Sequence, residues 1–345
     1  MKNIIKSMAA ALLLTASATA ANAEGKLIIY HWFEYIPQEL LDKFAKQHDV
    51  EVTMDTYDGN ESMLATLKAG AIGTYDVAVP SDYMVKIMSN EGMLDAIADG
   101  ELKNKGNIQE KWADPNFDPG RKHSIPYQWG STSFSVDTAV YKGDINTTDI
   151  LFNPPAELSG RINVIDSQGE VLAMAAQHMG IPQCSQDRDQ LKALNEMLQN
   201  AKGHWASFNS DTAKEVLVSG DVTVGMIYDG FGAKARAERP TLQYAFPTQG
   251  YVAWMDSVVL LKDAPNRANA IKFMDFLLEP ENIAAVSNFA RYNNGVKGAE
   301  AFVDKDLVTQ PENNPHAEAG PSVFIEVCDE ATQAVYDKIW TNLKK

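Results

Sequence analysis

The sequence has little of what metal centres and catalytic sites use. It contains only two cysteines, Cys184 and Cys328, and its six histidines are scattered without the spacing of metal ligands. No Cys-x-x-Cys pair or Cys/His cluster is present, which argues against a zinc site. A Gly-x-Ser-x-Gly nucleophile elbow, a phosphate-binding P-loop and a dinucleotide fingerprint are also missing. A hydrolase is therefore the weakest functional hypothesis.

Long apolar runs are scarce as well. Lys2 and Lys6 form a short basic start, and the apolar run from Met8 to Thr15 is too short to span a bilayer. Ala21-Asn22-Ala23 then supplies the small residues that a signal peptidase recognises. We expect residues 1–23 to be a signal peptide cut after Ala23, with no lipid anchor because no Cys follows the cut. This order of features predicts a protein of the Gram-negative periplasm.

Positive charge is in deficit. The chain has 30 Lys and Arg against 46 Asp and Glu, a formal net charge of -16, and loss of Lys2 and Lys6 with the expected signal peptide makes it -18. Nucleic-acid binding requires a basic surface, so this class is disfavoured. An acidic balance is compatible with a cationic ligand. The remaining chain of about 320 residues exceeds what one core usually holds, which predicts two lobes.

The compartment bears on the two cysteines. In an oxidising periplasm Cys184 and Cys328 can form a disulfide. The bond also requires that their Cα atoms lie within a few ångström of each other, which the sequence does not reveal. The pairing is therefore left open at this stage.

Predicted strands and helices alternate along the chain. β-Branched or alternating apolar runs predict strands, and apolar residues three or four positions apart predict helices. Strands are expected at residues 26–30, 51–57, 76–79, 161–166, 222–228 and 252–261. Helices are expected after Pro37, Asn60 and Ser81, and around 170–179, 187–200, 211–219, 265–278, 280–289 and 323–344. The alternation predicts an α/β architecture with a largely parallel sheet.

Several loops at the ends of the predicted strands combine aromatic and acidic residues. In open α/β sheets such loops form the ligand crevice. Carboxylates neutralise ammonium groups, and aromatic faces attract cations and cover methylene chains. Each loop alone could hold only core aromatics and surface acids, but the same pairing recurs in five, which favours a site for an organic cation. These loops are Trp32–Tyr35, Ser81–Tyr83, Asp166–Glu170, Tyr228–Asp229 and Trp254–Asp256.

At these loops the chain resembles the periplasmic spermidine/putrescine-binding proteins of ABC importers. The matching segments keep their order from about residue 26 to the C-terminus, so the resemblance covers the whole expected mature chain. They are Tyr30–Pro37, Tyr75–Ser81, Phe117–Pro119, Ser124–Gly130, Phe208–Asp211, Gly225–Gly230, Trp254–Ser257 and Phe276–Pro280.

The resemblance implies an α/β fold of the two-lobed periplasmic-binding-protein type (type II), with a central ligand cleft and a hinge. Lobe 1 would comprise residues 26–133 plus 256–300, and lobe 2 residues 134–255 plus 301–345. The implied function is capture of a polyamine of the putrescine or spermidine class by lobe closure and delivery to an inner-membrane ABC permease. Neither catalysis nor a cofactor is implied, and we expect a monomer.

The resemblance also implies a set of ligand-binding residues. Aromatic and hydroxyl side chains would line the pocket, and acids would face the amines. The aromatic and hydroxyl set is Trp32, Tyr35, Ser81, Tyr83, Ser210, Tyr228, Trp254 and Tyr292. The acidic set is Glu34, Asp166, Glu170, Asp256 and Glu326.

The chain departs from the family pattern at positions that bear on ligand length. Ser167 replaces the acid that spermidine-type members carry three residues before the Glu170 equivalent, and Asp166 stands one place earlier, as in putrescine-type members. Phe231 occupies a position where some putrescine-type members have an acid, and Phe33 replaces a small hydroxyl residue. The choice between putrescine and spermidine therefore stays open.

Two rival hypotheses keep the same fold. The protein could be a periplasmic sensor that presents its liganded form to a membrane signalling receptor, because lobe closure would serve either purpose. The ligand could also be another organic cation, such as agmatine. A quaternary ammonium ligand is disfavoured, since it would need an aromatic cage with few hydrogen-bonding acids.

Overall fold

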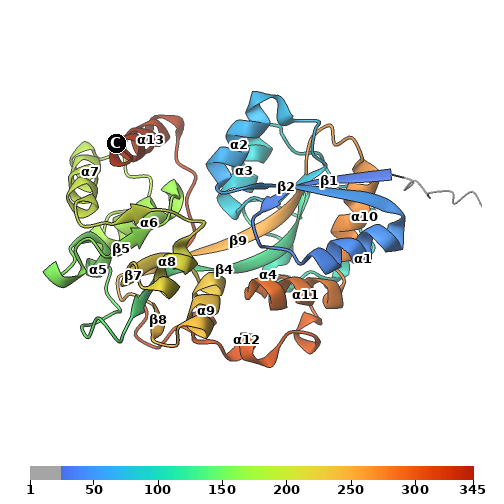
Figure 1. Ribbon diagram of the computed structural model, residues 1–345. Helices are drawn as coiled ribbons and strands as arrows, with labels where there is room; N and C mark the ends of the chain where they lie inside the picture. Colours follow the sequence, from blue (N-terminus) through green and yellow to red (C-terminus); the bar gives the residue numbers. More distant parts are fainter. Residues whose placement is uncertain (1–24) are drawn as a thin grey trace, which may run out of the picture.

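The computed structural model describes residues 25–345, so the expected signal peptide lies outside the described residues. Two groups of strands and helices form two lobes, which a pair of long strands connects (Figure 1). Each lobe buries its own apolar side chains, in clusters centred on Phe44 and Phe273 in one lobe and on Phe134 and Leu194 in the other. Within residues 25–345, no helix combines the length and apolar character required to cross a membrane.

Lobe 1 contains the first three strands, all parallel. β1 (Gly25–Trp32) lies between β2 (Val50–Tyr57) and β3 (Val77–Ala78). Its helices are α1 (Gln38–His48), α2 (Asn60–Thr66), α3 (Asp82–Asn90), α4 (Glu110–Ala113), α10 (Arg267–Leu277) and α11 (Pro280–Ala290). α1 ends at Asp49, which takes the left-handed conformation that commonly terminates a helix. The crossover order places the loops after β1, β2 and β3 at one edge of the sheet.

Lobe 2 repeats this arrangement with β5 (Ile162–Val164), β6 (Ser207–Phe208) and β7 (Val224–Tyr228), which are parallel. β8 (Leu242–Ala245) is antiparallel to β4. The surrounding helices are α5 (Asp149–Phe152), α6 (Gln168–Met179), α7 (Arg188–Lys202), α8 (Ala213–Ser219), α9 (Asp229–Glu238) and α13 (Glu330–Leu343). α6 ends at Gly180, a left-handed glycine.

The lobes are joined by β4 (Ser124–Asp137) and β9 (Tyr251–Leu260), which pair antiparallel. The C-terminal end of β9 pairs with β3 in lobe 1, and the C-terminal half of β4 pairs with β7 in lobe 2. One sheet thus continues through both lobes in the order β2-β1-β3-β9-β4-β7-β5-β6. β10 (Asn293–Asn294) and β11 (Ser322–Val323) add short pairings, and α12 (Lys305–Thr309) follows lobe 1.

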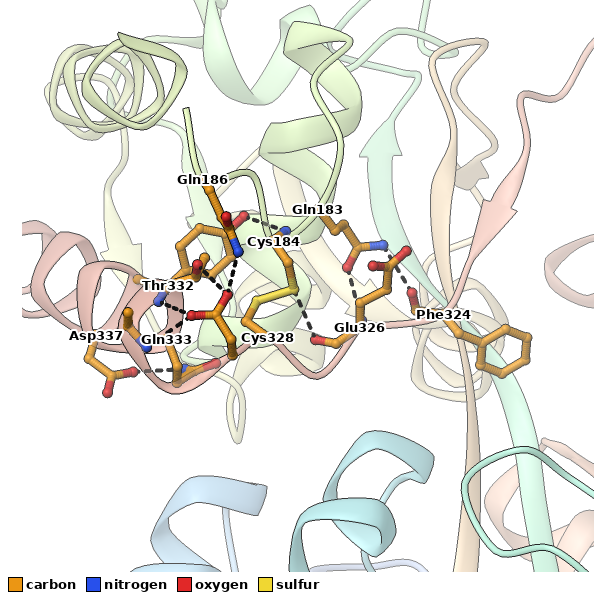
Figure 2. Close-up of a disulfide and its surroundings, with 12 residues drawn as sticks. Gln183, Cys184, Gln186, Phe324, Glu326, Cys328, Thr332, Gln333 and Asp337 are labelled. Atoms are coloured by element: carbon orange, nitrogen blue, oxygen red, sulfur yellow. Dashed lines mark hydrogen bonds between the residues drawn. A yellow bond between two sulfur atoms is a disulfide. The ribbon is translucent and has the colours of Figure 1, made fainter. Parts of the chain in front are cut away.

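Cys184 and Cys328 form a disulfide, with Cα atoms 5.1 Å apart. The bond fixes the segment before α13 to the loop after α6 (Figure 2). Gln183 reinforces it, since its Nε2 donates to the Phe324 carbonyl at 3.0 Å and its Oε1 accepts from the Glu326 amide at 3.2 Å. The last part of the chain, predicted to be helical from residue 323, has no regular secondary structure over residues 324–329, and the helix begins only at Glu330.

Candidate functional site

The loops at the strand ends of both lobes enclose a central cavity of about 670 Å³, its open mouth included. The ends of β1 and β2, the residue before α3 and a residue just after the end of α11 line one side from lobe 1, while α6, the loop before α8, the end of β7 and α9 line the other from lobe 2. Hinge strand β9 contributes Trp254 and Asp256. The lining residues are Trp32, Phe33, Tyr35, Tyr57, Asp58, Ser81, Glu170, Ser210, Asp211, Tyr228, Phe231, Trp254, Asp256 and Tyr292.

Most of the cavity wall is aromatic. Trp32 is fixed by donating its Nε1 proton to the Val79 carbonyl at 2.7 Å, and its ring lies 4.6 Å from that of Tyr57. Deeper in, the Trp254 ring lies 5.2 Å from Tyr292 and 6.1 Å from Tyr228, both edge to face. Such rings offer π-faces to a cation and apolar surface to a hydrocarbon chain.

Asp256, in β9, brings a buried carboxylate to the cavity. Its Oδ2 accepts from the Tyr35 hydroxyl at 2.9 Å and its Oδ1 from the Ser81 hydroxyl at 2.7 Å. Asn60 in turn holds Ser81, donating to its Oγ at 3.0 Å. Burial raises the pKa of Asp256 to about 7, although the two hydroxyl donors oppose the shift.

Glu170, in the first turn of α6, supplies a second buried carboxylate from the opposite lobe. The hydroxyl of Ser167 donates to its Oε2, so the residue that replaces a family acid here supports the remaining one. Burial raises the pKa of Glu170 to about 7, and the nearby carboxylate of Glu61 adds to the shift. The start of a helix otherwise favours a negative charge.

Within residues 25–345, neither carboxylate has a cationic partner. The ion pairs among residues 25–345 join other side chains and include neither Asp256 nor Glu170. A buried carboxylate without a counter-charge is costly, which is why both pKa values rise. A cationic ligand between the lobes would supply the missing charge to both.

Two further acids lie on the cavity wall, one from each lobe. Asp58 follows β2 and Asp211 precedes α8. Burial raises the pKa of Asp211, and the negative charges of Asp58 and Asp166 raise it further. The sequence could have predicted Asp58 as a site residue, because it directly follows a predicted strand. The indication for Asp211 was weaker and consisted only of its position after Ser210.

Nine of the thirteen residues expected from the resemblance line the central cavity: Trp32, Tyr35, Ser81, Glu170, Ser210, Tyr228, Trp254, Asp256 and Tyr292. Five further residues line the cavity but were not in the expected ligand set: Phe33, Tyr57, Asp58, Asp211 and Phe231. Phe33 and Phe231 had been marked only as departures from the family pattern.

The other four expected residues do not line the cavity. Glu34 is exposed in a turn where its backbone φ is 49°. Asp166 is exposed and pairs with Lys344. Tyr83 donates its hydroxyl proton to Glu61 at 2.8 Å and, with the exposed Glu326, faces a second cavity beside the disulfide. Local pairing and backbone direction thus take these side chains away from the ligand wall.

Known proteins match the chain over most of its length. It is 31% identical to the spermidine/putrescine-binding periplasmic protein of Escherichia coli K12, over 97% of this chain and 96% of that protein. It is 29% identical to the putrescine-binding periplasmic protein SpuD of Pseudomonas aeruginosa, over 100% and 99%.

Solved structures agree with these relatives. A structure assigned to a spermidine/putrescine ABC transporter of Listeria monocytogenes superimposes with a TM-score of 0.86 at 27% identity, covering 92% of this chain and 98% of that one. PotD of Streptococcus pneumoniae, a spermidine/putrescine substrate-binding protein, gives a TM-score of 0.76 at 26% identity over 93% and 98%. The model of the bacterial extracellular solute-binding protein family matches residues 39–318. The two lobes, the hinge strands and the cavity between them therefore have a common explanation, and the chain belongs to this family of solute-binding proteins.

Proposed function

We propose that the protein captures a linear polyamine of the putrescine or spermidine class in the periplasm and delivers it to an ABC importer. The observation that carries the proposal is the pair Asp256 and Glu170, two buried carboxylates in one aromatic cavity that no cationic side chain of residues 25–345 neutralises. A polyamine supplies separated ammonium groups joined by methylene chains, which matches separated acids joined by aromatic surface. The names of the relatives from Escherichia coli and Pseudomonas aeruginosa support the same ligand class.

The proposed action is binding by lobe closure, without chemical conversion of the ligand. We propose residues 26–133 plus 256–300 as lobe 1 and 134–255 plus 301–345 as lobe 2. The separate buried clusters on either side of β4 and β9 support this division. Two antiparallel strands that continue from one lobe to the other can act as a hinge by small dihedral changes along their length.

Delivery requires export of the chain and a membrane partner. Cleavage after Ala23 would release a mature protein that begins at Glu24. The disulfide Cys184–Cys328 supports an oxidising compartment. An inner-membrane ABC permease is the proposed partner of the monomer, supported by the transporters to which the structural relatives from Listeria monocytogenes and Streptococcus pneumoniae belong.

A thermal-shift screen of residues 24–345 tests the proposed ligand class. The panel contains putrescine, cadaverine, spermidine, norspermidine, agmatine, glycine betaine and several amino acids. Agmatine is included because one relative, from Pseudomonas aeruginosa, is a putrescine/agmatine-binding protein. A ligand that binds only the folded state raises the Tm according to its concentration relative to its Kd. A rise confined to polyamines supports the proposal, whereas a rise only with betaine or an amino acid refutes it.

A further inference from the structure

Outside the central cavity, the two lobes meet where helix α9 of lobe 2 approaches the C-terminal end of α11 of lobe 1 (Figure 1). Two residues of α9, Gly230 and Lys234, make this approach, and neither lines the central cavity. They are four residues apart, so they lie on the same face of the helix.

The contact at Gly230 is too close for any side chain. A Cβ atom built there would lie 2.6 Å from the carbonyl oxygen of Ala290 and 2.5 Å from Cε1 of Tyr292. The carbonyl is main chain, so it cannot rotate aside as a flexible side chain could. Gly230 does not have a positive φ, and the backbone conformation therefore does not demand glycine. What demands glycine is the distance between the lobes.

Lys234 adds a contact on the same face. Its Nζ lies 4.9 Å from the ring centroid of Phe289 in α11 and 5.2 Å from that of Phe231 in α9 itself. A cation over aromatic faces is favourable, more so where water is partly excluded. The carbonyl end of α11 is also the negative end of that helix dipole.

These contacts adjoin the ligand site. Phe231 lies between Gly230 and Lys234 in sequence and lines the central cavity. Its ring lies 6.5 Å from that of Tyr292, another wall residue, which comes from the other lobe. The distance between α9 and the end of α11 therefore also sets how closely Phe231 and Tyr292 enclose a ligand.

We propose that Gly230 and Lys234 form an interlobe latch, in which the missing side chain permits closure and the lysine holds it. The two are positioning residues that set affinity through Phe231 and Tyr292 without touching the ligand. This inference rests on the proposed function in one respect, that the bound ligand is a polyamine. The contact between α9 and α11 itself does not depend on which solute is bound.

Gly230→Ala in the mature chain is the first test. Alanine favours a helix more than glycine does, which should offset the packing lost when α9 is held away from Ala290, so the Tm measured without polyamine should change little. The added methyl group should nevertheless keep α9 away from Ala290, and we expect the affinity for the polyamine identified in the screen to fall at least tenfold. Gly106→Ala is the matched control, because a Cβ there meets nothing within 4 Å. A variant that binds like the wild type overturns the latch, as does one whose Tm falls along with its affinity.

Lys234→Met tests the second half of the latch. Methionine keeps an unbranched apolar side chain but removes the charge, so the ligand should dissociate several-fold faster, with the association rate little changed. Lys192→Met on the exposed face of α7 is the control. Equal dissociation rates for Lys234→Met and the wild type overturn the role of the lysine.

Small-angle scattering separates failure of the latch from failure of the proposed function. A Cβ at Gly230 leaves no room for the close approach of α9 to Ala290, so Gly230→Ala should have a larger radius of gyration than the wild type, both measured without added polyamine. If no polyamine binds the wild type, the proposed ligand is wrong, and a larger radius of the variant still supports the latch. Equal radii in that case overturn the latch as well.

Discussion

At the scale of single residues, the central cavity depends on acids that have no positive partner in the part of the chain that the structure describes. Asp256 receives hydrogen bonds from two neutral hydroxyls, those of Tyr35 and Ser81, and is 5% exposed. This arrangement orients the carboxylate without neutralising it. The net charge is therefore available to a cationic ligand, at the expense of the stability of the ligand-free protein.

Asp256→Asn should weaken polyamine binding by about 1.5–3 kcal/mol, the usual range for a hydrogen bond to a charged group. The amide keeps the shape of the side chain and one acceptor but removes the charge. Titration calorimetry measures the loss, with Asp42→Asn on the exposed side of α1 as a control. An unchanged Kd would place the ammonium groups elsewhere in the cavity.

Polyamine affinity should rise with pH up to about 7 and then level off. Asp256 and Glu170 both have a pKa raised to about 7 in the free protein, and an ammonium beside each would lower it. Binding below pH 7 therefore releases protons, and affinity should change by about tenfold per pH unit for each acid that must ionise. Calorimetry in buffers of different ionisation enthalpy counts these protons. Affinity independent of pH between 5 and 8 would contradict this coupling.

The same raised pKa values affect the ligand-free protein with the opposite sign. As the pH rises above about 4, both acids ionise in the unfolded chain before they ionise in the folded one. The stability contributed by their protonated forms is therefore lost progressively between about pH 4 and 7. Polyamine affinity is therefore highest at about pH 7 and above, whereas these two groups stabilise the ligand-free fold most below about pH 4.

The sequence could predict the site residues that lie on or just after strands, but not those whose direction depends on the conformation of a turn. Trp32, Tyr228 and Trp254 lie on strands, where the pleat fixes the direction of the side chain. The rule that residues at the ends of predicted strands line the ligand crevice therefore predicted them correctly as cavity residues. Tyr57 and Asp58 obey the same rule at the end of β2 and could have been found. Glu34 satisfied the rule but lies in a left-handed turn that exposes it, and only the folded backbone reveals that.

At the scale of elements, the strands and helices with strong apolar periodicity were predicted within a few residues. The predicted strand 51–57 is β2 at Val50–Tyr57, and the predicted helix 280–289 is α11 at Pro280–Ala290. The longest strand, β4, was not predicted. It contains Pro126 and Gly130 and alternates with serine and threonine, so neither propensity nor periodicity marks it. β4 is a strand because both lobes cover it, which is a tertiary effect.

The disulfide should stabilise the fold more than it affects binding. It joins positions 144 residues apart, and the chain-entropy relation for a loop of that length gives about 5 kcal/mol. Cys184→Ser/Cys328→Ser should lower the Tm markedly, while the Kd changes little because neither residue lines the central cavity. Reduction of the wild type should reproduce the loss. An unchanged Tm, or a loss confined to binding, would contradict this assignment.

At the scale of the whole molecule, the shared sheet and the buried clusters of the two lobes serve different purposes. The separate cores let each lobe keep its own packing, while β4 and β9 carry the sheet from one lobe to the other. Packed interiors transmit displacement rather than absorb it, so motion is concentrated in the strands between them. The cavity loops lie beside these strands, so a small change in the hinge alters every cavity wall together.

The overall charge should speed up capture of a cation more than it strengthens the final complex. A chain with a net charge of -16, or -18 after loss of the expected signal peptide, attracts a polyamine over distances that salt shortens, from about 30 Å at 0.01 M to about 10 Å at 0.1 M ionic strength. Stopped-flow measurements of tryptophan fluorescence should therefore show an association rate that falls several-fold over this range. The dissociation rate should change little, because Asp256 and Glu170 are buried and poorly screened. Sucrose at matched viscosity controls for diffusion. If salt acts mainly on dissociation, the ammonium groups are held at the exposed rim, by acids such as Asp58, rather than between the two buried carboxylates.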